Sequence, residues 1–407
     1  MQAREFDVVV WGASGFTGRL VAEHLLTRYG ADGELRWALG GRNAARLEAV
    51  RSELGAAAAG VPILTANIDD AASLAALVAR TRVICTTVGP YALYGSGLVA
   101  ACAASGTHYC DLTGEVQWMR RMIDAHHETA RQSGARIVHT CGFDSIPSDL
   151  GVFDLQRAFM ERFGRPAECV AFRGLEFRGG FSGGTIASML NMLNEADHDA
   201  SIYPLLADPY GLNPAGERHG LDGPEPALPA FDNERRAWLT PFVMASINTK
   251  VVRRSNALAG YPYGHDFRYD EATVMPHGLW GFPAALAMSV ASAAGMAAMR
   301  VPSVRRFVGK RLPQPGEGPS AAVRESGFYL LELTASTRVS AAQRLTLRIR
   351  GDRDPGYGST ARMLGESAVC LAQDALDSAG GVLTPATAMG GALVRRLTER
   401  AGITFEY

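Results

Sequence analysis

Residues 6–140 show a repeating pattern in which short apolar runs alternate with longer amphipathic segments. The apolar runs have the length of buried strands and cover residues 6–11, 35–39, 61–66, 83–88, 108–112 and 136–140. Between them, apolar residues at helical spacing predict helices at 19–29, 71–79, 96–104 and 115–133. Strands that alternate with helices over this length predict an α/β fold with a doubly wound parallel sheet.

The alternation changes after residue 150. Strands are predicted at 169–177, 327–334 and 345–350, and a helix at 186–194 follows a glycine-rich loop at 179–185. We therefore expect a first domain over 1–150 and a second α+β domain over 151–350 with a mostly antiparallel sheet. Residues 208–232 contain five prolines and four glycines, which is typical either of a lid or of a surface insertion. Helices return at 361–378 and 389–400.

A glycine-rich turn joins the first apolar run to the first helix. It consists of Gly12, Ala13, Ser14, Gly15, Phe16, Thr17 and Gly18. Gly12 permits a tight turn, Gly15 lets the backbone approach a pyrophosphate, and Gly18 lets the helix pack closely on the strand. The helix N-terminus adds unpaired N–H groups. We therefore predict a Rossmann-type dinucleotide-binding domain with these seven residues at the phosphates.

The end of the second predicted strand indicates which dinucleotide is bound. No carboxylate lies between Glu34 and Glu48 to accept a hydrogen bond from a ribose 2′-hydroxyl. Arg42 stands there instead, and its planar guanidinium suits a 2′-phosphate. We expect NADP(H), although Arg42 could also be a solvated surface residue. The residues expected around the adenosine half are Arg42, Asn43, Asn67 and Ile68.

Composition and charge exclude several classes of protein. With 47% hydrophobic and 20% charged residues, the 407-residue chain can bury a large core. Its 40 Lys+Arg nearly balance its 41 Asp+Glu, so it lacks the basic character of a nucleic-acid-binding protein. The spacing of Cys and His matches no zinc site, and we expect no metal. Six scattered cysteines and a start without signal-peptide features favour a cytoplasmic protein.

Residues 279–299 form an uncharged run of 21, eight of them alanine. The run is long enough to span a bilayer, but Pro283 and several serines and glycines make insertion unfavourable. Because small residues allow close packing, a buried helix is the favoured interpretation, either inside the fold or at the subunit contact of a homodimer. An exposed helix in peripheral contact with a membrane, lipid or acyl chain is the alternative.

Ligands of a doubly wound sheet bind beyond the carboxyl ends of its strands. After the strand at 83–88, Gly89 and Pro90 would lie against the nicotinamide ribose. Tyr91 and Tyr94 follow, and their hydroxyls are candidate catalytic groups that donate a proton or anchor a carbonyl. Packing of these two rings against the second domain is an equal alternative.

Two further polar segments follow the next strands. The run Asp111, Thr113 and Glu115 begins a helix, where such residues more often cap the helix than catalyse. Asp144, after the strand at 136–140, is the strongest single candidate for a second catalytic group.

Several segments together resemble one family, the saccharopine dehydrogenase-like oxidoreductases. They are VVVWGASGFTG (8–18), GGRN (40–43), VGPYALYG (88–95), YCDLTGE (109–115), CGFDSIPSDLG (141–151), GDRDPGYGST (351–360) and LTPA (383–386). Within the family the chain is most similar to the trans-acting enoyl reductases, which act on polyketide-type lipid chains. The resemblance implies an NADP(H)-dependent reductase whose residues 351–407 return to the nucleotide domain. It does not identify the acceptor.

Three functional hypotheses follow. The first is NADPH-dependent reduction of a C=C bond in a polyketide or lipid-like acyl chain, free or bound to a carrier. The second is saccharopine-type or imine chemistry on a small amino acid, whose carboxylates need basic partners; Lys250, Arg253 and Arg254 form the one tight basic cluster in the middle domain. The third is a non-catalytic partner protein that binds NADPH.

Overall fold

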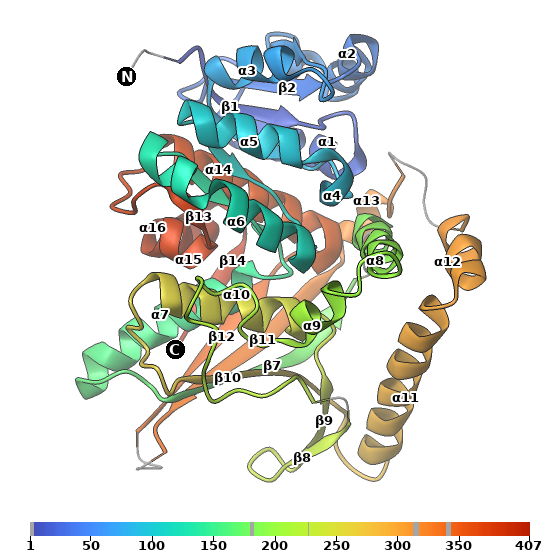
Figure 1. Ribbon diagram of the computed structural model, residues 1–407, viewed down its shortest axis with the longest axis vertical. Helices are drawn as coiled ribbons and strands as arrows, with labels where there is room; N and C mark the ends of the chain where they lie inside the picture. Colours follow the sequence, from blue (N-terminus) through green and yellow to red (C-terminus); the bar gives the residue numbers. More distant parts are fainter. Residues whose placement is uncertain (1–3, 180–182, 227, 312–316, 339–342) are drawn as a thin grey trace.

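Two seven-stranded sheets form the framework of the molecule (Figure 1). The computed structural model describes residues 4–179, 183–226, 228–311, 317–338 and 343–407. The first sheet lies in the upper part of Figure 1, where the chain begins, and the second lies in the lower part. This arrangement confirms the predicted α/β class with a second, α+β unit.

The first sheet is entirely parallel. Its strands are β1 (Phe6–Trp11), β2 (Trp37–Gly41), β3 (Ile63–Thr65), β4 (Thr81–Thr86), β5 (His108–Cys110), β6 (Arg136–Val138) and β13 (Gly381–Leu383). Their spatial order is β13-β6-β5-β4-β1-β2-β3, with Val9 on β1 beside Ala38 on β2 and Ile84 on β4. The strand order therefore reverses between β1 and β4, which is where dinucleotides bind in such sheets.

Helices cover both faces of the first sheet. One face carries α1 (Phe16–Tyr29), α2 (Ala44–Glu53) and, from the far end of the chain, α14 (Thr360–Gln373). The other face carries α3 (Ala71–Ala79), α5 (Ser96–Ser105) and α6 (Val116–Ser133). In Figure 1, α5 and α6 lie in front and α14 behind them. The apolar stripes of these helices form two cores, one on each side of the sheet.

The second sheet is mixed and mostly antiparallel. Its strands, in spatial order, are β14 (Ile403–Glu406), β12 (Arg344–Gly351), β11 (Phe328–Ser336), β7 (Cys169–Arg178), β10 (Arg268–Val274), β9 (Ala237–Pro241) and β8 (Ala230–Asp232). Only the neighbours β7 and β10 run parallel among these strands. The helices α7 (Ile146–Phe163) and α10 (Ala245–Leu258) pack on one face. Glu332 on β11 forms ion pairs with Arg348 on β12 and with Arg235 in the turn between β8 and β9.

The remaining helices connect or flank the two sheets. They are α4 (Tyr91–Tyr94), α8 (Gly183–Ala196), α9 (Ile202–Ala207), α11 (Gly281–Met299), α12 (Pro302–Gly309), α13 (Ala321–Glu325), α15 (Pro385–Ala388) and α16 (Gly390–Arg400). Of the loop predicted at 179–185, residues 180–182 lie outside the described residues, and α8 begins at Gly183.

The end of the chain contributes a strand to each sheet. Val382 on β13 pairs with Ile137 on β6, and Phe405 on β14 pairs with Ile349 on β12. The sequence predicted only helices in this region. Because α14 also packs on β1 and β4, the last fifty residues connect the two sheets.

Residues 279–299 are not buried within the chain, so the interpretation as a helix inside the fold is wrong, whereas burial at a subunit contact stays a prediction. They do form a helix, α11, but only 11% of its most apolar window is buried inside the molecule. α11 runs along the outside of the body at the right of Figure 1. By length and composition alone, it is one helix that could cross a membrane.

Candidate active site

The glycine turn after β1 has the geometry of a phosphate cradle. Gly12 has a φ of +88°, which side-chain-bearing residues rarely adopt. A Cβ added to Gly18 would lie 2.2 Å from the Gly12 carbonyl oxygen, and one added to Gly15 would lie 3.3 Å from the same atom. The turn therefore packs tightly at the start of α1, whose first backbone N–H groups have no partner within the helix.

Ala13, Ser14, Phe16 and Thr17 complete this turn. Ala13 is buried, whereas Ser14 and Thr17 are partly exposed at the helix N-terminus. The Phe16 ring packs edge-on against Tyr357, with 4.9 Å between ring centroids, and the Arg324 guanidinium lies 5.3 Å from its centroid. The turn is thereby held from the side by the C-terminal part of the chain.

The residues predicted at the adenosine half lie at the ends of β2 and β3. Arg42 is exposed and forms no ion pair with any described residue, so its guanidinium is available to a phosphate. The Asn43 side chain instead caps α2 by accepting a hydrogen bond from Arg46 N at 3.0 Å. Asn67 Oδ1 accepts from Asp69 N at 3.1 Å, and Ile68 packs on the core beside it.

Glu115 holds the Gly89–Pro90 loop in place. Its buried carboxylate accepts hydrogen bonds from Tyr91 N at 2.7 Å and Ala92 N at 3.0 Å, and so caps α4. The Ser188 hydroxyl of α8 donates to the same carboxylate at 2.8 Å. Burial raises the pKa of Glu115. The sequence predicted that this residue caps the helix that it begins. The helix it caps is instead α4, which follows β4, and residue spacing alone could not show this.

Tyr91 and Tyr94 have different environments. The Tyr91 ring is buried and stacks on Trp118 at 5.6 Å, and its hydroxyl donates to the Thr86 carbonyl at 3.3 Å. Burial also raises the pKa of Tyr91 well above its ordinary value. These contacts favour the packing interpretation for Tyr91. Tyr94 is exposed, and its hydroxyl has no hydrogen-bond partner within the described part of the chain.

Asp111 ties the ends of β5 and β6 together. Its buried carboxylate accepts from Tyr109 at 2.9 Å, from Thr140 N at 3.2 Å and from Thr113 N at 3.1 Å, and it lies 2.8 Å from His139 Nδ1. With both oxygens engaged, Asp111 acts as a structural bridge.

Asp144 lies in the loop between β6 and α7. Unlike Asp111, its carboxyl makes no hydrogen bond or ion pair with another described residue. Desolvation by burial raises its pKa from 3.8 to about 6. The neighbouring Phe143 ring packs on Phe177 and Tyr329 of the second sheet, which gives the loop an apolar surrounding. A carboxyl with these properties can hold a proton near neutral pH.

The segment 354–360 connects the Asp144 loop to the glycine turn. Thr360 Oγ1 accepts a hydrogen bond from Phe143 N at 3.0 Å and donates to Pro355 O at 2.8 Å. Asp354 accepts from Tyr357 N and Gly358 N, which forms the turn that places the Tyr357 ring on Phe16. The sequence indicated this segment only through the family resemblance.

Comparison with known proteins agrees with this geometry. Residues 8–138 match the family model described as the saccharopine dehydrogenase NADP-binding domain. A Mycobacterium tuberculosis protein, to which trans-acting enoyl reduction is assigned provisionally, is 46% identical over 99% of this chain and 97% of its own length. The trans-acting enoyl reductase of Mycobacterium ulcerans is 41% identical over 97% of this chain and 96% of its own. The chain belongs to the saccharopine dehydrogenase-like family, among the trans-acting enoyl reductases.

The same membership confirms the resemblance and the NADP(H) cofactor predicted from the sequence. The fold is also that of saccharopine dehydrogenase from Saccharomyces cerevisiae, with a TM-score of 0.54, 13% identity and 98% coverage of each chain. At this identity the likeness concerns the fold alone. Every family feature discussed above, from the cradle to Asp144, lies at or near the carboxyl edge of the first sheet.

The basic cluster of Lys250, Arg253 and Arg254 is bound to groups of the protein itself. Arg253 donates to Asp222 at 2.8 Å, and Arg254 donates to the backbone carbonyls of Leu212 and Val382. Lys250 donates to Ser246 O at 2.9 Å. The two arginines fix the described part of segment 208–232 on the body, which favours a surface insertion over a lid.

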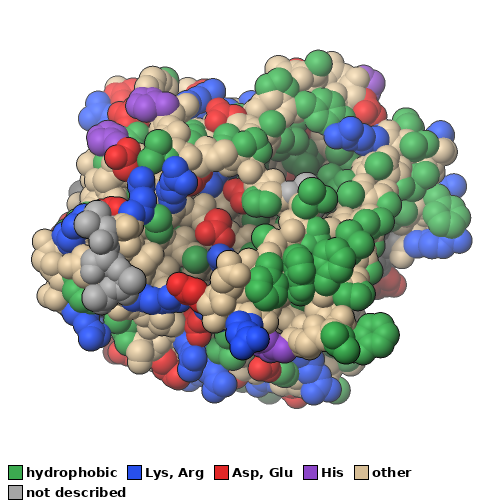
Figure 2. Space-filling model, turned by 90° about the horizontal axis from the view of Figure 1, so that it is seen from below, with side chains coloured by type: hydrophobic (Ala, Val, Ile, Leu, Met, Phe, Trp, Pro, Cys, Tyr) green, Lys and Arg blue, Asp and Glu red, His purple; other side chains and the backbone are tan. Residues whose placement is uncertain are grey.

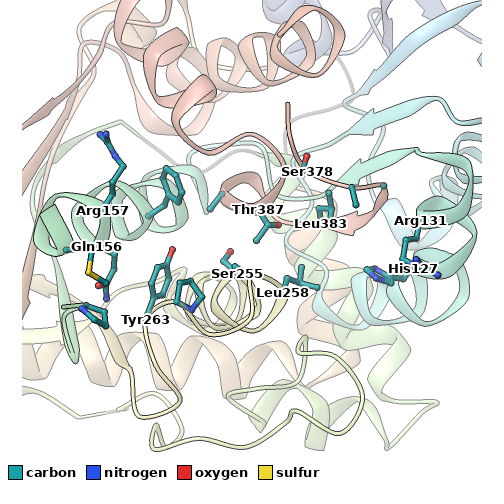
Figure 3. A pocket seen from close by; sticks show the side chains of 18 residues that line it. His127, Arg131, Gln156, Arg157, Ser255, Leu258, Tyr263, Ser378, Leu383 and Thr387 are labelled. Atoms are coloured by element: carbon teal, nitrogen blue, oxygen red, sulfur yellow. The ribbon is translucent and has the colours of Figure 1, made fainter. Parts of the chain in front are cut away.

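A cavity of about 630 Å³ lies away from this site (Figure 3). It opens between α6, α7, α10 and the residues around β13, and Tyr263, Leu258 and Leu383 are among the side chains that line it. None of its lining residues is one predicted for the cofactor or for catalysis. The cavity therefore does not change the placement of the candidate active site.

Proposed function

We propose that this protein is an NADPH-dependent reductase of a C=C bond conjugated to a carbonyl, in a polyketide or lipid-like acyl chain. The observation that carries the proposal is Asp144, a protonatable carboxyl without partners among the described residues, at the edge of the sheet where the substrate would meet the nicotinamide. The names of the full-length relatives support the same reaction class.

The cradle fits the cofactor because its glycines leave room for a pyrophosphate and Arg42 is free to bind the extra phosphate. When bound, NADPH supplies a hydride to one carbon of the double bond. The other carbon takes a proton, which we assign to the Asp144 carboxyl. Because its pKa is raised to about 6, about half of Asp144 is protonated at pH 6 and about a tenth at pH 7.

The other residues of the site position these groups. Glu115 and Ser188 fix the Gly89–Pro90 loop against which the nicotinamide ribose would lie. Tyr94 presents its exposed hydroxyl on the helix that follows this loop, and we assign it to the substrate carbonyl. A small amino-acid substrate has weaker support, because Lys250, Arg253 and Arg254 already bind protein groups.

The test mixes the protein with NADPH and enoyl thioesters and follows absorbance at the nicotinamide band. We expect turnover, with a rate that falls as pH rises through about 6 because Asp144 loses its proton. Asp144→Asn should lower kcat by about 100-fold or more. The matched control Asp270→Asn changes an exposed aspartate on the second sheet and should leave kcat unchanged.

Two outcomes would overturn the proposal. Turnover on an imine or amino acid, without turnover on any enoyl substrate, would favour the saccharopine-type reaction. No NADPH oxidation with either class of substrate would favour the non-catalytic partner. Wild-type activity of Asp144→Asn on enoyl substrates would keep the reaction and remove Asp144 as the proton donor.

Cofactor selectivity gives a second, independent prediction. Arg42→Glu should raise the Kd of NADPH by about tenfold or more, because a charge-assisted bond to the 2′-phosphate is lost and a repulsive charge added. The Kd of NADH should change less than about twofold. Calorimetric titration measures both, with the exposed Arg395→Glu as the control. Equal weakening of both cofactors would mean that the 2′-phosphate lies elsewhere.

A further inference from the structure

The helix α11 and its N-terminal flank expose an unusual amount of apolar surface. Leu279 is 95% exposed and Trp280 78% exposed at the start of the helix. Further along, large apolar side chains are also exposed, at Phe282, Leu286, Met288 and Val290. Figure 2 shows hydrophobic side chains gathered on the right of the molecule, the side on which α11 lies in Figure 1. Soluble proteins rarely expose a contiguous apolar patch of this kind without a binding role.

The exposed surface is not confined to one stripe of the helix. Only Gly281, Ala285 and Ser289, which follow one another at four-residue spacing, are buried, where α11 packs on β9. From Val290 to Ala298 every residue is exposed, so the second half of the helix is apolar and open around its whole circumference. One partner helix would cover one side of such a cylinder and leave the other sides in water.

The charge next to this surface has one sign. No acidic residue occurs between Glu271 and Glu317, whereas α11 is followed by five basic residues within twelve positions. Of these, Arg305 is buried against Asp197, and Arg306, Lys310 and Arg311 are exposed and form no ion pair with a described residue. Phe307 is exposed among them, beneath the Arg311 guanidinium.

We propose that α11 and α12 seat this protein on the surface of an anionic lipid bilayer. α11 lies in the interfacial plane with its apolar side chains among the acyl chains, and Trp280 sits at the headgroup level. The exposed cations of α12 contact the lipid phosphates. A bilayer surface can cover most of the circumference of α11 and complements the charge of α12 in one contact.

The attachment of both helix ends argues for a helix that lies on the membrane. At its start α11 packs on β9, and after its end α12 packs on α8, which is joined to Glu115 of the first domain through Ser188. A span would place these two ends on opposite sides of the bilayer, although both belong to one folded body. The 19 residues cover about 28 Å, so the helix can run along the surface between the two points.

Charge also argues against a second copy of this chain as the occupant. In a symmetric dimer the same patch meets itself, and because no acidic residue lies between Glu271 and Glu317, the α11–α12 segment of a second copy offers Arg306, Lys310 and Arg311 no acidic partner. A membrane rich in anionic lipid attracts the same cations. This proposal rests on the surface alone and is independent of the proposed reaction.

The experiment is flotation of the full-length protein with vesicles. We expect binding to vesicles of phosphatidylglycerol and phosphatidylcholine, and at least about tenfold weaker binding to pure phosphatidylcholine or at high salt. The triple variant R306E/K310E/R311E should lose about tenfold or more of the binding to anionic vesicles. Its matched control, R218E/R350E/R395E, reverses three exposed arginines on other surfaces and should bind like the wild type.

A second variant tests the apolar contact. Leu279→Ser with Trp280→Ser removes two side chains that are almost fully exposed, so the fold should remain intact, as circular dichroism and NADPH binding can show. Vesicle binding should fall by about tenfold. Absence of anionic-vesicle binding by the wild type would overturn the proposal. So would equal binding by both triple variants, or a lipid-free dimer that this apolar variant converts to a monomer.

Discussion

The helices α10 and α11 reverse the usual relation between composition and burial. α10 carries Lys250, Arg253 and Arg254, and all three are at least 96% buried. α11 carries no charged residue and is exposed along most of its length. Charged side chains are rarely buried unless paired, and apolar helices are rarely left in water. The difference shows that burial here follows from the available partners.

The partners of α10 come from a segment that the sequence left without regular structure. Asp222 and Glu225 pair with Arg253, and the carbonyl of Leu212 accepts from Arg254. Burial of these cations is therefore matched by hydrogen bonds and opposite charge. α11 has no comparable layer across its outer side, and its apolar surface remains open until a partner outside the chain covers it.

The largest expected effect comes from breaking the pairing of α10. Arg253→Ala should reduce the free energy of unfolding by about 3–5 kcal/mol, because it removes a buried cation and leaves the partly buried carboxylates of Asp222 and Glu225 without their partner. Urea denaturation measures the change. The control Arg344→Ala removes an exposed ion pair with Glu234 and should cost less than about 1 kcal/mol. Equal effects would mean that the cations of α10 do not fix the 208–232 segment.

The sequence predicted the first sheet well because most of its strands are short runs rich in apolar residues. β1 is buried at all six positions, and the glycine turn after it can adopt few other shapes. β13, with three residues, carries no such pattern, and its place beside β6 depends on contacts made after the rest of the sheet has formed. Short strands of this kind are determined by tertiary pairing.

The functional residues also divide into those that the sequence could identify and those that only the folded structure reveals. Arg42 could be found because its position follows from the strand before it. The link from Glu115 to the Tyr91 backbone joins two loops 24 residues apart, so only the folded sheet shows it. Dependence on the folded structure also explains the error at α11. The uncharged run at 279–299 predicts a helix, but its residues alone do not determine whether the rest of the chain covers that helix.

An intermediate effect is expected from the polar layer beneath α10. Glu271 on β10 accepts hydrogen bonds from Ser148, Tyr269 and Asn248, and burial raises its pKa from 4.5 to about 7. A carboxyl with a raised folded-state pKa stabilises the fold most below about pH 4.5, and this contribution is lost as pH rises towards 7. Between these values the folded state keeps the proton and the unfolded state releases it.

Glu271→Gln removes this titration. The difference in unfolding free energy between variant and wild type should therefore shift in favour of the variant by up to about 3 kcal/mol from pH 4.5 to pH 8. Urea denaturation at a series of pH values measures it. A difference that stays constant across this range would show that Glu271 is ionised in the folded protein, and that the layer beneath α10 behaves like a solvated surface.

The smallest effect should come from α11 itself. Val290 is 57% exposed, so Val290→Ser should change the free energy of unfolding by less than about 0.5 kcal/mol in the absence of lipid. Ala285→Leu, on the buried side of the same helix against β9, should cost about 1–3 kcal/mol through overpacking. If Val290→Ser costs as much as Ala285→Leu and the cost grows with protein concentration, a second copy covers α11 in solution, and the contrast with α10 disappears. If the cost stays small at every concentration, α11 is exposed in the free protein, and the surface that covers it is not a second copy of this chain.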